Sequence, residues 1–221
     1  MTSTVKILGI IGGLVVVVMI GIIAYGEITK PIGTDILQRP TEQWSVGNSL
    51  TENTVLTYRF SHVDNDYVEL KTILKFFEKQ EQNWRVHIII EDPIGNMNEQ
   101  ELFLSQSMIP ITPIEPHMKS YMRMIQDSIL WIVNYAVEPK YLIDNAVWGT
   151  MIHGVQKEEL KITAREDIVN KAGTFDSYVL SYKIKNKENM IWIVKDKPLP
   201  VKAEVYDIYG KLQFKFELVK N

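Results

Sequence analysis

The sequence contains no cysteine among its 221 residues. This absence excludes disulfide bonds, thiolate catalysis, cysteine-ligated zinc, iron–sulfur clusters and a lipid-modified cysteine. An excess of charge of one sign is also lacking, since 24 basic and 27 acidic side chains leave a formal net charge of −3. Because binding to nucleic acid depends on concentrated positive charge, we expect no nucleic-acid partner.

Common catalytic motifs are missing as well. The sequence has no GxxxxGK[ST], GxGxxG, GxSxG or HExxH motif, and no N-x-[ST] glycosylation sequon. The four catalytic patterns mark phosphate-binding loops, dinucleotide-binding turns, hydrolase nucleophile elbows and zincin sites. We therefore expect a protein that is not an enzyme and has no cofactor, although carboxylates that pair only in the folded chain would leave no motif.

One long apolar run dominates the N-terminus. Residues 7–26 carry no charge, and a helix of that length spans about 30 Å, which is the thickness of the bilayer's hydrocarbon core. Lys6 precedes the run and Glu27 follows it. Because positive charge tends to stay inside, we expect a single-pass signal anchor in the cell membrane, with residues 1–6 cytoplasmic and the rest extracytoplasmic. A cleaved signal peptide ending near residues 24–26 is the alternative.

The apolar run contains a GxxxG pair, formed by Gly9 and Gly13. Small residues at this spacing let two membrane helices approach closely, which favours a homodimer or a membrane-protein partner. Glycine is also common in membrane helices that make no such contact. The pair therefore predicts helix–helix contact without identifying the partner.

The remaining chain divides into a stalk over residues 27–53 and a β-rich domain over residues 54–221. The stalk contains Pro31, Gly33 and Pro40 and shows no sustained period. From Val55 onward, apolar and polar residues alternate in segments separated by turn-forming residues, roughly every ten residues, which is typical of an antiparallel meander. The expected strands are residues 55–63, 68–76, 84–90, 101–105, 160–164, 178–184, 190–194, 201–205 and 212–218.

Residues 117–135 follow a helical period instead. At 100° per residue, most polar side chains fall within one arc and the wide remaining arc is apolar, with only Leu130 on the polar side. Such a helix should pack deeply, against the concave face of the sheet or against the membrane surface. The expected fold class is α+β: a transmembrane helix, then a mostly antiparallel, curved half-barrel sheet packed on one amphipathic helix.

Methionine and histidine gather near this helix. Met118 and Met122 lie one helical turn apart, next to His117, and such soft ligands outside a membrane can hold Cu(I). Methionine also fills irregular gaps in apolar cores, and both methionines lie on the apolar arc. We therefore predict no metal site and keep copper binding as the alternative.

Three segments in residues 171–204 resemble the LolA-like half-barrel, which comprises periplasmic lipoprotein carriers and related exported domains. They are residues 171–176 (KAGTFD), 191–196 (IWIVKD) and 199–204 (LPVKAE). The resemblance implies a curved sheet that wraps a helix and leaves an apolar pocket for acyl chains. Unlike a carrier that shuttles freely, this chain keeps a predicted membrane anchor.

We expect a membrane-anchored extracytoplasmic domain that binds a lipid or another hydrophobic ligand in the concavity of the sheet. The candidate ligand-binding residues are Trp84, Ile88 and Trp192 from the sheet, and Met122, Ile125, Ile129 and Trp131 from the helix. These residues could equally fill a closed core, because both roles have the same sequence pattern. The alternative function is an accessory, assembly or sensor subunit that docks onto a larger membrane complex through the GxxxG-containing helix.

Overall fold

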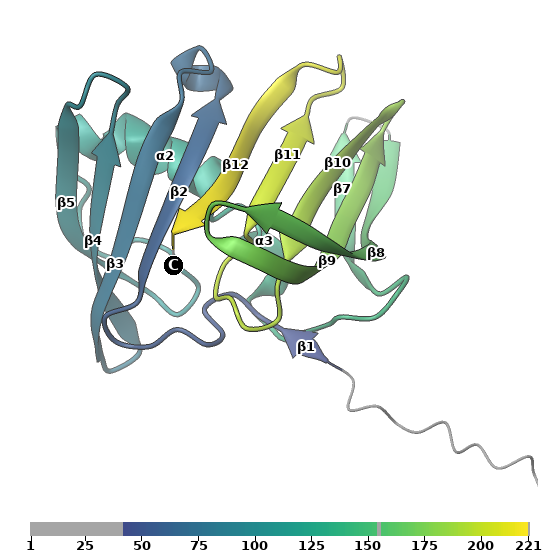
Figure 1. Cartoon of the computed structure of the whole chain (residues 1–221), viewed down its shortest axis with the longest axis horizontal. Coiled ribbons are helices and arrows are strands. Elements are labelled where there is room, and N and C mark those ends of the chain that lie inside the picture. The colour runs from purple at the N-terminus through teal and green to yellow at the C-terminus, as the bar shows by residue number, and fades with distance from the viewer. Residues whose placement is uncertain (1–41, 154–155, 221) are drawn as a thin grey trace, which may run out of the picture. The chain divides into compact units, whose positions relative to one another are not determined.

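The computed structural model describes residues 42–153 and 156–220 (Figure 1). The predicted anchor over residues 7–26, with Gly9 and Gly13, lies outside these residues. Within the described part of the chain, no helix has both the length and the apolar character needed to cross a bilayer.

A curved, ten-stranded antiparallel sheet forms the domain (Figure 1). Its order is β5-β4-β3-β2-β12-β11-β10-β9-β8-β7, so two meanders, β2–β5 and β7–β12, join where β2 pairs with β12. This confirms the expected mostly antiparallel sheet. The strands are β2 (Val55–His62), β3 (Leu70–Gln80), β4 (Asn83–Glu91), β5 (Met97–Leu104), β7 (Val147–His153), β8 (Gln156–Asn170), β9 (Gly173–Ile184), β10 (Lys187–Ile193), β11 (Lys202–Tyr206) and β12 (Leu212–Lys220).

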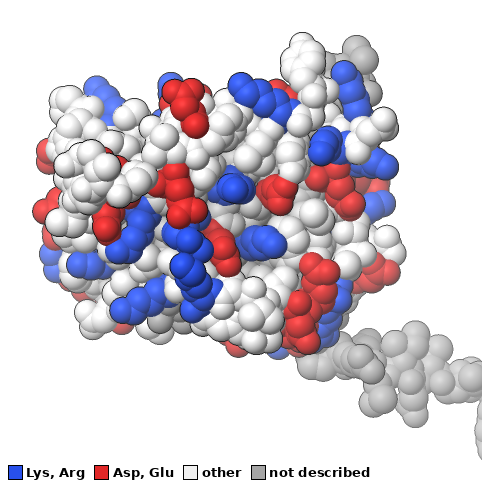
Figure 2. Space-filling model, turned by 45° about the horizontal axis from the view of Figure 1, so that its top comes forward, with Lys and Arg blue, Asp and Glu red and all other residues white. Residues whose placement is uncertain are grey.

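Alternation along the strands separates an inner, apolar face from an outer, charged one. In β3, Leu70, Thr72, Leu74 and Phe76 are buried while Lys71, Ile73 and Lys75 between them are partly exposed. Successive side chains in a strand point to opposite faces, so a period of two buries one whole face. The outer face pairs its charges, as in the contact of Lys71 with Glu91 at 2.6 Å. Figure 2 shows basic and acidic side chains interspersed over the visible surface.

A helical connection joins the two edges of the sheet. It contains the 3₁₀ turn η2 (Pro116–Met118), α2 (Lys119–Asp127) and α3 (Val133–Ala136). Because β5 and β7 are the edge strands, this connection has to cross the sheet, and Figure 1 shows α2 and α3 on one side of it. We call residues 116–136 the cover segment.

The predicted single helix over residues 117–135 is corrected, because α2 ends at Asp127 and α3 begins at Val133. At the break, the Ser128 hydroxyl donates to the Met124 carbonyl at 2.5 Å, and Leu130 N–H donates to the Ile125 carbonyl at 2.9 Å. A continuous helix would leave Leu130 on its polar side. The break turns Leu130 inward, where it is 4% exposed, and burial of this side chain favours the interrupted geometry.

The folded domain begins before the predicted boundary at residue 54. Strand β1 (Gln43–Trp44) pairs with β6 (Lys140–Tyr141), which follows the cover segment. Trp44 is 1% exposed, and its indole N–H donates to the Lys197 carbonyl at 2.7 Å. Gly47 N–H donates to the Pro198 carbonyl at 2.8 Å. Residues 42–53, assigned to the stalk from sequence, are therefore part of the domain.

Candidate functional site

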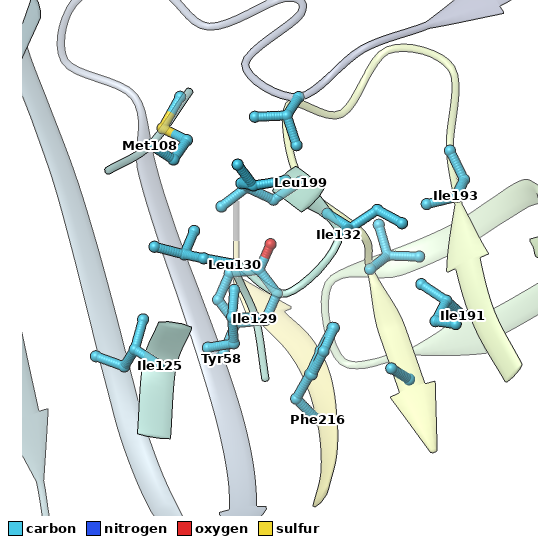
Figure 3. Packing of buried hydrophobic residues seen from close by; sticks show 14 of the residues in the cluster. Tyr58, Met108, Ile125, Ile129, Leu130, Ile132, Ile191, Ile193, Leu199 and Phe216 are labelled. Atoms are coloured by element: carbon cyan, nitrogen blue, oxygen red, sulfur yellow. The ribbon is translucent and has the colours of Figure 1, made fainter. Parts of the chain in front are cut away.

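The inner face of the sheet meets the cover segment through apolar side chains. Figure 3 shows Ile125 and Ile129 among Tyr58 of β2 and Phe216 of β12. All four side chains are at most 3% exposed. The cover segment thus lies over the central strands and excludes water from them.

Most of the predicted ligand-binding residues meet in this interior. Met122, Ile125 and Ile129 of the cover segment belong to the same buried cluster as Trp84 and Ile88 of β4. In this closed arrangement all but Trp84 have no exposed surface, and Trp84 is 8% exposed. They therefore pack as core residues.

Trp131 lies at the seam between the cover segment and the sheet. Its ring stacks on Tyr182 of β9 with centroids 6.0 Å apart and contacts Tyr135 with centroids 5.1 Å apart. Trp131 remains partly exposed while Tyr182 is buried. Burial raises the pKa of the Tyr182 hydroxyl well above its usual value. The structure thus brings Trp131 together with two aromatic residues that the sequence did not single out.

Trp192 is 4% exposed and belongs to the same buried cluster, but it lies on the other face of the sheet. Ile191 and Ile193 of β10 point into the interior (Figure 3), so Trp192 between them lies on the outer face. There its indole N–H donates to Glu166 at 2.6 Å, and the Lys202 ammonium lies 4.4 Å from its ring centroid. Residues 190–194 are all apolar, so their alternation could not indicate which face is covered.

A surface hollow opens beside Trp84, with a volume of about 400 Å³. Its wall combines the ends of β3 and β4 with the N-terminal segment of the domain and with Val137, just beyond the cover segment. Trp84 is thus the predicted residue that connects the buried cluster to a solvent-accessible hollow. Other residues that line it include Val46, Leu50, Lys79 and Gln106.

One buried hydroxyl on the inner face has no hydrogen-bond partner among the described residues. Thr72 of β3 is 0% exposed and lies between Tyr58 and Ile90 in the strand register. The neighbouring Tyr58 hydroxyl is satisfied, because it donates to the Pro200 carbonyl at 3.1 Å. Sequence reasoning missed Thr72, although a threonine in phase with Leu70 and Leu74 was the available signal.

Apart from the Tyr135 hydroxyl, which donates to the Met151 sulfur of β7 at 2.8 Å, the polar links that the described residues make from the cover segment to the β-strands and their turns are exposed or long. Arg123 pairs with Asp64 at 2.6 Å, and their side chains are 65% and 39% exposed. The Asn98 amide donates to the Tyr121 hydroxyl at 3.5 Å. Exposed ion pairs contribute about 0–1 kcal/mol. Apolar contact is therefore the main force that holds the cover segment in place.

The cover segment carries the histidine and methionines that suggested copper. Within residues 42–153 and 156–220, no three histidine, aspartate or glutamate side chains gather in a geometry that could hold a metal ion. Met118 and Met122 are fully buried in the apolar cluster. The His117 side chain is 47% exposed and lies 3.5 Å from Glu115. Both methionines therefore pack in the apolar core.

Comparison with known proteins gives one similar structure. No protein-family model matches the chain, and no curated protein sequence matches it. A Bacteroides fragilis protein described as a candidate exported protein with a YmcC-like fold is similar over 80% of this chain and 99% of its own. The sequence identity is 9% and the TM-score is 0.39. Similarity at this level identifies neither a family nor a function for this chain.

Proposed function

We propose that the domain binds a lipid or another hydrophobic molecule between the inner face of the sheet and the cover segment. One observation carries this proposal: the cover segment crosses from β5 to β7 and rests on the sheet mainly through apolar side chains. The proposed role is binding, with no bond made or broken.

Displacement of the cover segment would uncover apolar surface that a ligand can bury again. Each Å² of apolar surface removed from water contributes about 25 cal/mol, so an acyl chain can replace the contacts that the segment gives up. Met118, Met122 and Met124 supply many of these contacts. Methionine adapts to irregular shapes because its side chain is unbranched and flexible, so this segment can repack around a ligand at low cost.

Two further features of the interior suit a ligand with a polar group. The unpartnered hydroxyl of Thr72 offers a hydrogen bond within an apolar site, where an unsatisfied polar group costs about 1–3 kcal/mol. The hollow beside Trp84 lies next to the cluster, so an elongated molecule bound in the interior would have room there for a polar end. A chain with an ester, carbonyl or hydroxyl group fits both features.

The site of action in this proposal is the outer side of a membrane. Residues 7–26 are long and apolar enough to anchor the chain, and Lys6 before them favours a cytoplasmic N-terminus. The domain would then meet its ligand at the bilayer surface. The LolA-like resemblance in residues 171–204 supports the same type of ligand, an acyl chain.

Locking the cover segment tests the proposal. We would prepare the full chain in detergent as the double variant Asp64→Cys/Arg123→Cys and close it with a short bismaleimide that contains a cleavable disulfide. Because the natural chain has no cysteine, the cross-link forms only at the engineered pair. The expected result is that binding of a fluorescent anthroyloxy fatty acid falls at least tenfold on cross-linking and returns on reduction.

The matched control is the pair Arg165→Cys/Asp176→Cys. This pair replaces an exposed ion pair between β8 and β9, away from the cover segment. Its cross-link should leave fatty-acid binding unchanged. Unchanged binding in the cross-linked Asp64/Arg123 variant would contradict the proposed opening of the cover segment.

A further inference from the structure

The two edges of the ten-stranded sheet are covered differently. At β5, the following loop runs along the edge: Ile111 N–H donates to the Phe103 carbonyl at 2.9 Å, and the Gln100 amide donates to the Pro113 carbonyl at 2.9 Å. At β7, among the described residues, the only backbone ladder is the one with β8. The outer edge of β7 therefore keeps free N–H and C=O groups.

The composition of β7 suits pairing with another strand. Its residues, VWGTMIH, include no lysine, arginine, acidic residue or proline. Exposed edges are usually protected by such residues, because a bare edge attracts other strands. Val147, Thr150 and Ile152 are exposed, Val147 by 51% and Ile152 by 64%. A register shift between Val147 and Gly149 lets all three face the same outer side of the sheet.

We propose that β7 pairs antiparallel with β7 of a second copy of this chain, around a two-fold axis at Thr150. In this register Gly149 lies opposite the partner's Met151, and both are inner-face positions. Ile152 lies opposite the partner's register shift between Val147 and Gly149. The exposed Ile152 and Val147 side chains of the two copies then cover each other. The two sheets become one continuous sheet, and neither edge strand stays bare.

The place where the chain enters the domain favours a second copy as the occupant. Trp44 stacks on Trp148 of β7 with centroids 5.8 Å apart, and Leu142 N–H donates to the Glu42 carbonyl at 2.7 Å. The described chain therefore begins close to Trp148 of β7. An N-terminal tether attached at this point keeps the free edges of two neighbouring copies near each other.

The GxxxG pair strengthens this argument. Contact through Gly9 and Gly13 would hold two chains together, and residues 27–41 can extend by at most about 50 Å. Tethering within such a distance raises the effective concentration of one edge at the other to about the millimolar range. Weak strand pairing then suffices for a dimer. This pairing requires no bound ligand, so it stands apart from the proposed function.

A single engineered cysteine tests the pairing. In full-length Thr150→Cys, kept in its native membrane and mildly oxidised, residue 150 would lie directly opposite its own copy. Opposed residues in antiparallel strands have Cα atoms about 4.5–5.5 Å apart, within the range for a disulfide. We expect most of the protein to run as a disulfide-linked homodimer on non-reducing gels.

The matched control is Ile94→Cys, at a turn residue that is 84% exposed and lies between β4 and β5. It should cross-link at least fivefold less. Equal cross-linking of the two variants overturns the proposal, and so does a Thr150→Cys product whose mass shows a different protein.

A second variant separates loss of pairing from loss of folding. Ile152→Lys places a charge on the exposed side of β7 and should lower Thr150→Cys cross-linking at least fivefold. Its thermal midpoint should stay within a few degrees of the parent, because the side chain is exposed. Undiminished cross-linking in this folded variant also overturns the proposal.

Discussion

Trp44 and Trp148 stack with ring centroids 5.8 Å apart and ring planes 15° from parallel. Each indole N–H also donates to a backbone carbonyl, that of Trp44 to Lys197 and that of Trp148 to Tyr141. This pair joins the start of the described domain to β7, the edge strand of the ten-stranded sheet. Close to it, the Val46 N–H donates to the Ala136 carbonyl at 2.8 Å, so the end of the cover segment is held beside the start of the described domain.

Removal of the Trp44 ring should loosen this junction. Trp44→Ala deletes a buried aromatic side chain, and we expect the free energy of unfolding to fall by about 3–5 kcal/mol. Hydrogen exchange should accelerate first in residues 136–142, because Val46 and Glu42 hydrogen-bond to that stretch. Denaturant unfolding and exchange mass spectrometry measure both effects. In the control Tyr209→Ala, at a side chain that is 83% exposed, both should stay near the parent values.

Gly149 is expected to be required for the close approach of α3 to β7. A Cβ atom at this position would lie 2.5 Å from Cδ1 of Tyr135. Gly149→Ala should therefore destabilise the domain by about 1–3 kcal/mol through overpacking. In a Tyr135→Ala background the ring is gone, and the same substitution should cost much less. A double-mutant cycle from urea unfolding gives the coupling, and strictly additive effects would contradict this explanation.

The Thr72 hydroxyl should destabilise the ligand-free domain. Thr72→Val removes a buried polar group that has no partner among the described residues, so we expect the domain to gain about 1 kcal/mol. The matched control is Thr163→Val, because the Thr163 hydroxyl lies 2.9 Å from that of Ser181. Loss of this hydrogen bond should lower the free energy of unfolding by about 1 kcal/mol. Thermal unfolding compares the two changes, and a loss of stability in Thr72→Val would refute the assignment.

Glu42 should contribute to stability in a pH-dependent way. Hydrogen bonds from the Tyr178 hydroxyl and the Lys195 ammonium hold the pKa of Glu42 below its ordinary value of 4.5. Because the folded pKa is depressed, this contribution is complete above pH 4.5 and is lost as the pH falls through the folded pKa. Glu42→Gln should therefore flatten the acid side of the stability curve and leave its slope near neutral pH unchanged. Urea midpoints measured across the acid range test this, and an unaltered acid slope would exclude it.

The contribution of Tyr178 to stability should have the opposite dependence on pH, because it is lost as the pH rises. Burial first, and then its hydrogen bond to Glu42, raise the pKa of Tyr178 to about 12. Because the folded pKa is raised above the ordinary value of 10, its contribution is complete below pH 10 and is lost as the pH rises towards 12. In Glu42→Gln the pKa should fall only part of the way, because burial remains. Ultraviolet titration against Tyr178→Phe isolates this group, and a return to the ordinary value would show that burial is not the main cause.

Local periodicity predicted nine of the ten strands of the large sheet and missed β7. The expected strands 55–63 and 68–76 correspond to β2 and β3, and the structure pairs Val55–Phe60 with Leu70–Lys75. The connection between these strands includes Asp66, whose φ of +48° is one that aspartate adopts more readily than most residues. Periodicity did not predict the helical break at Ser128, because a helical period does not show which side chain a neighbouring sheet will bury.

The sequence by itself determined the absence of cysteine chemistry, the apolar run over residues 7–26, and the two-residue rhythm of the strands. Tertiary structure decided the pairing of β2 with β12, the inward turn of Leu130 and the outer position of Trp192. A period of two defines two faces of a strand but does not say which face another element will cover. Long-range packing determines which face is covered. In residues 190–194 both faces are apolar, so the sequence pattern does not distinguish them and the fold alone decides.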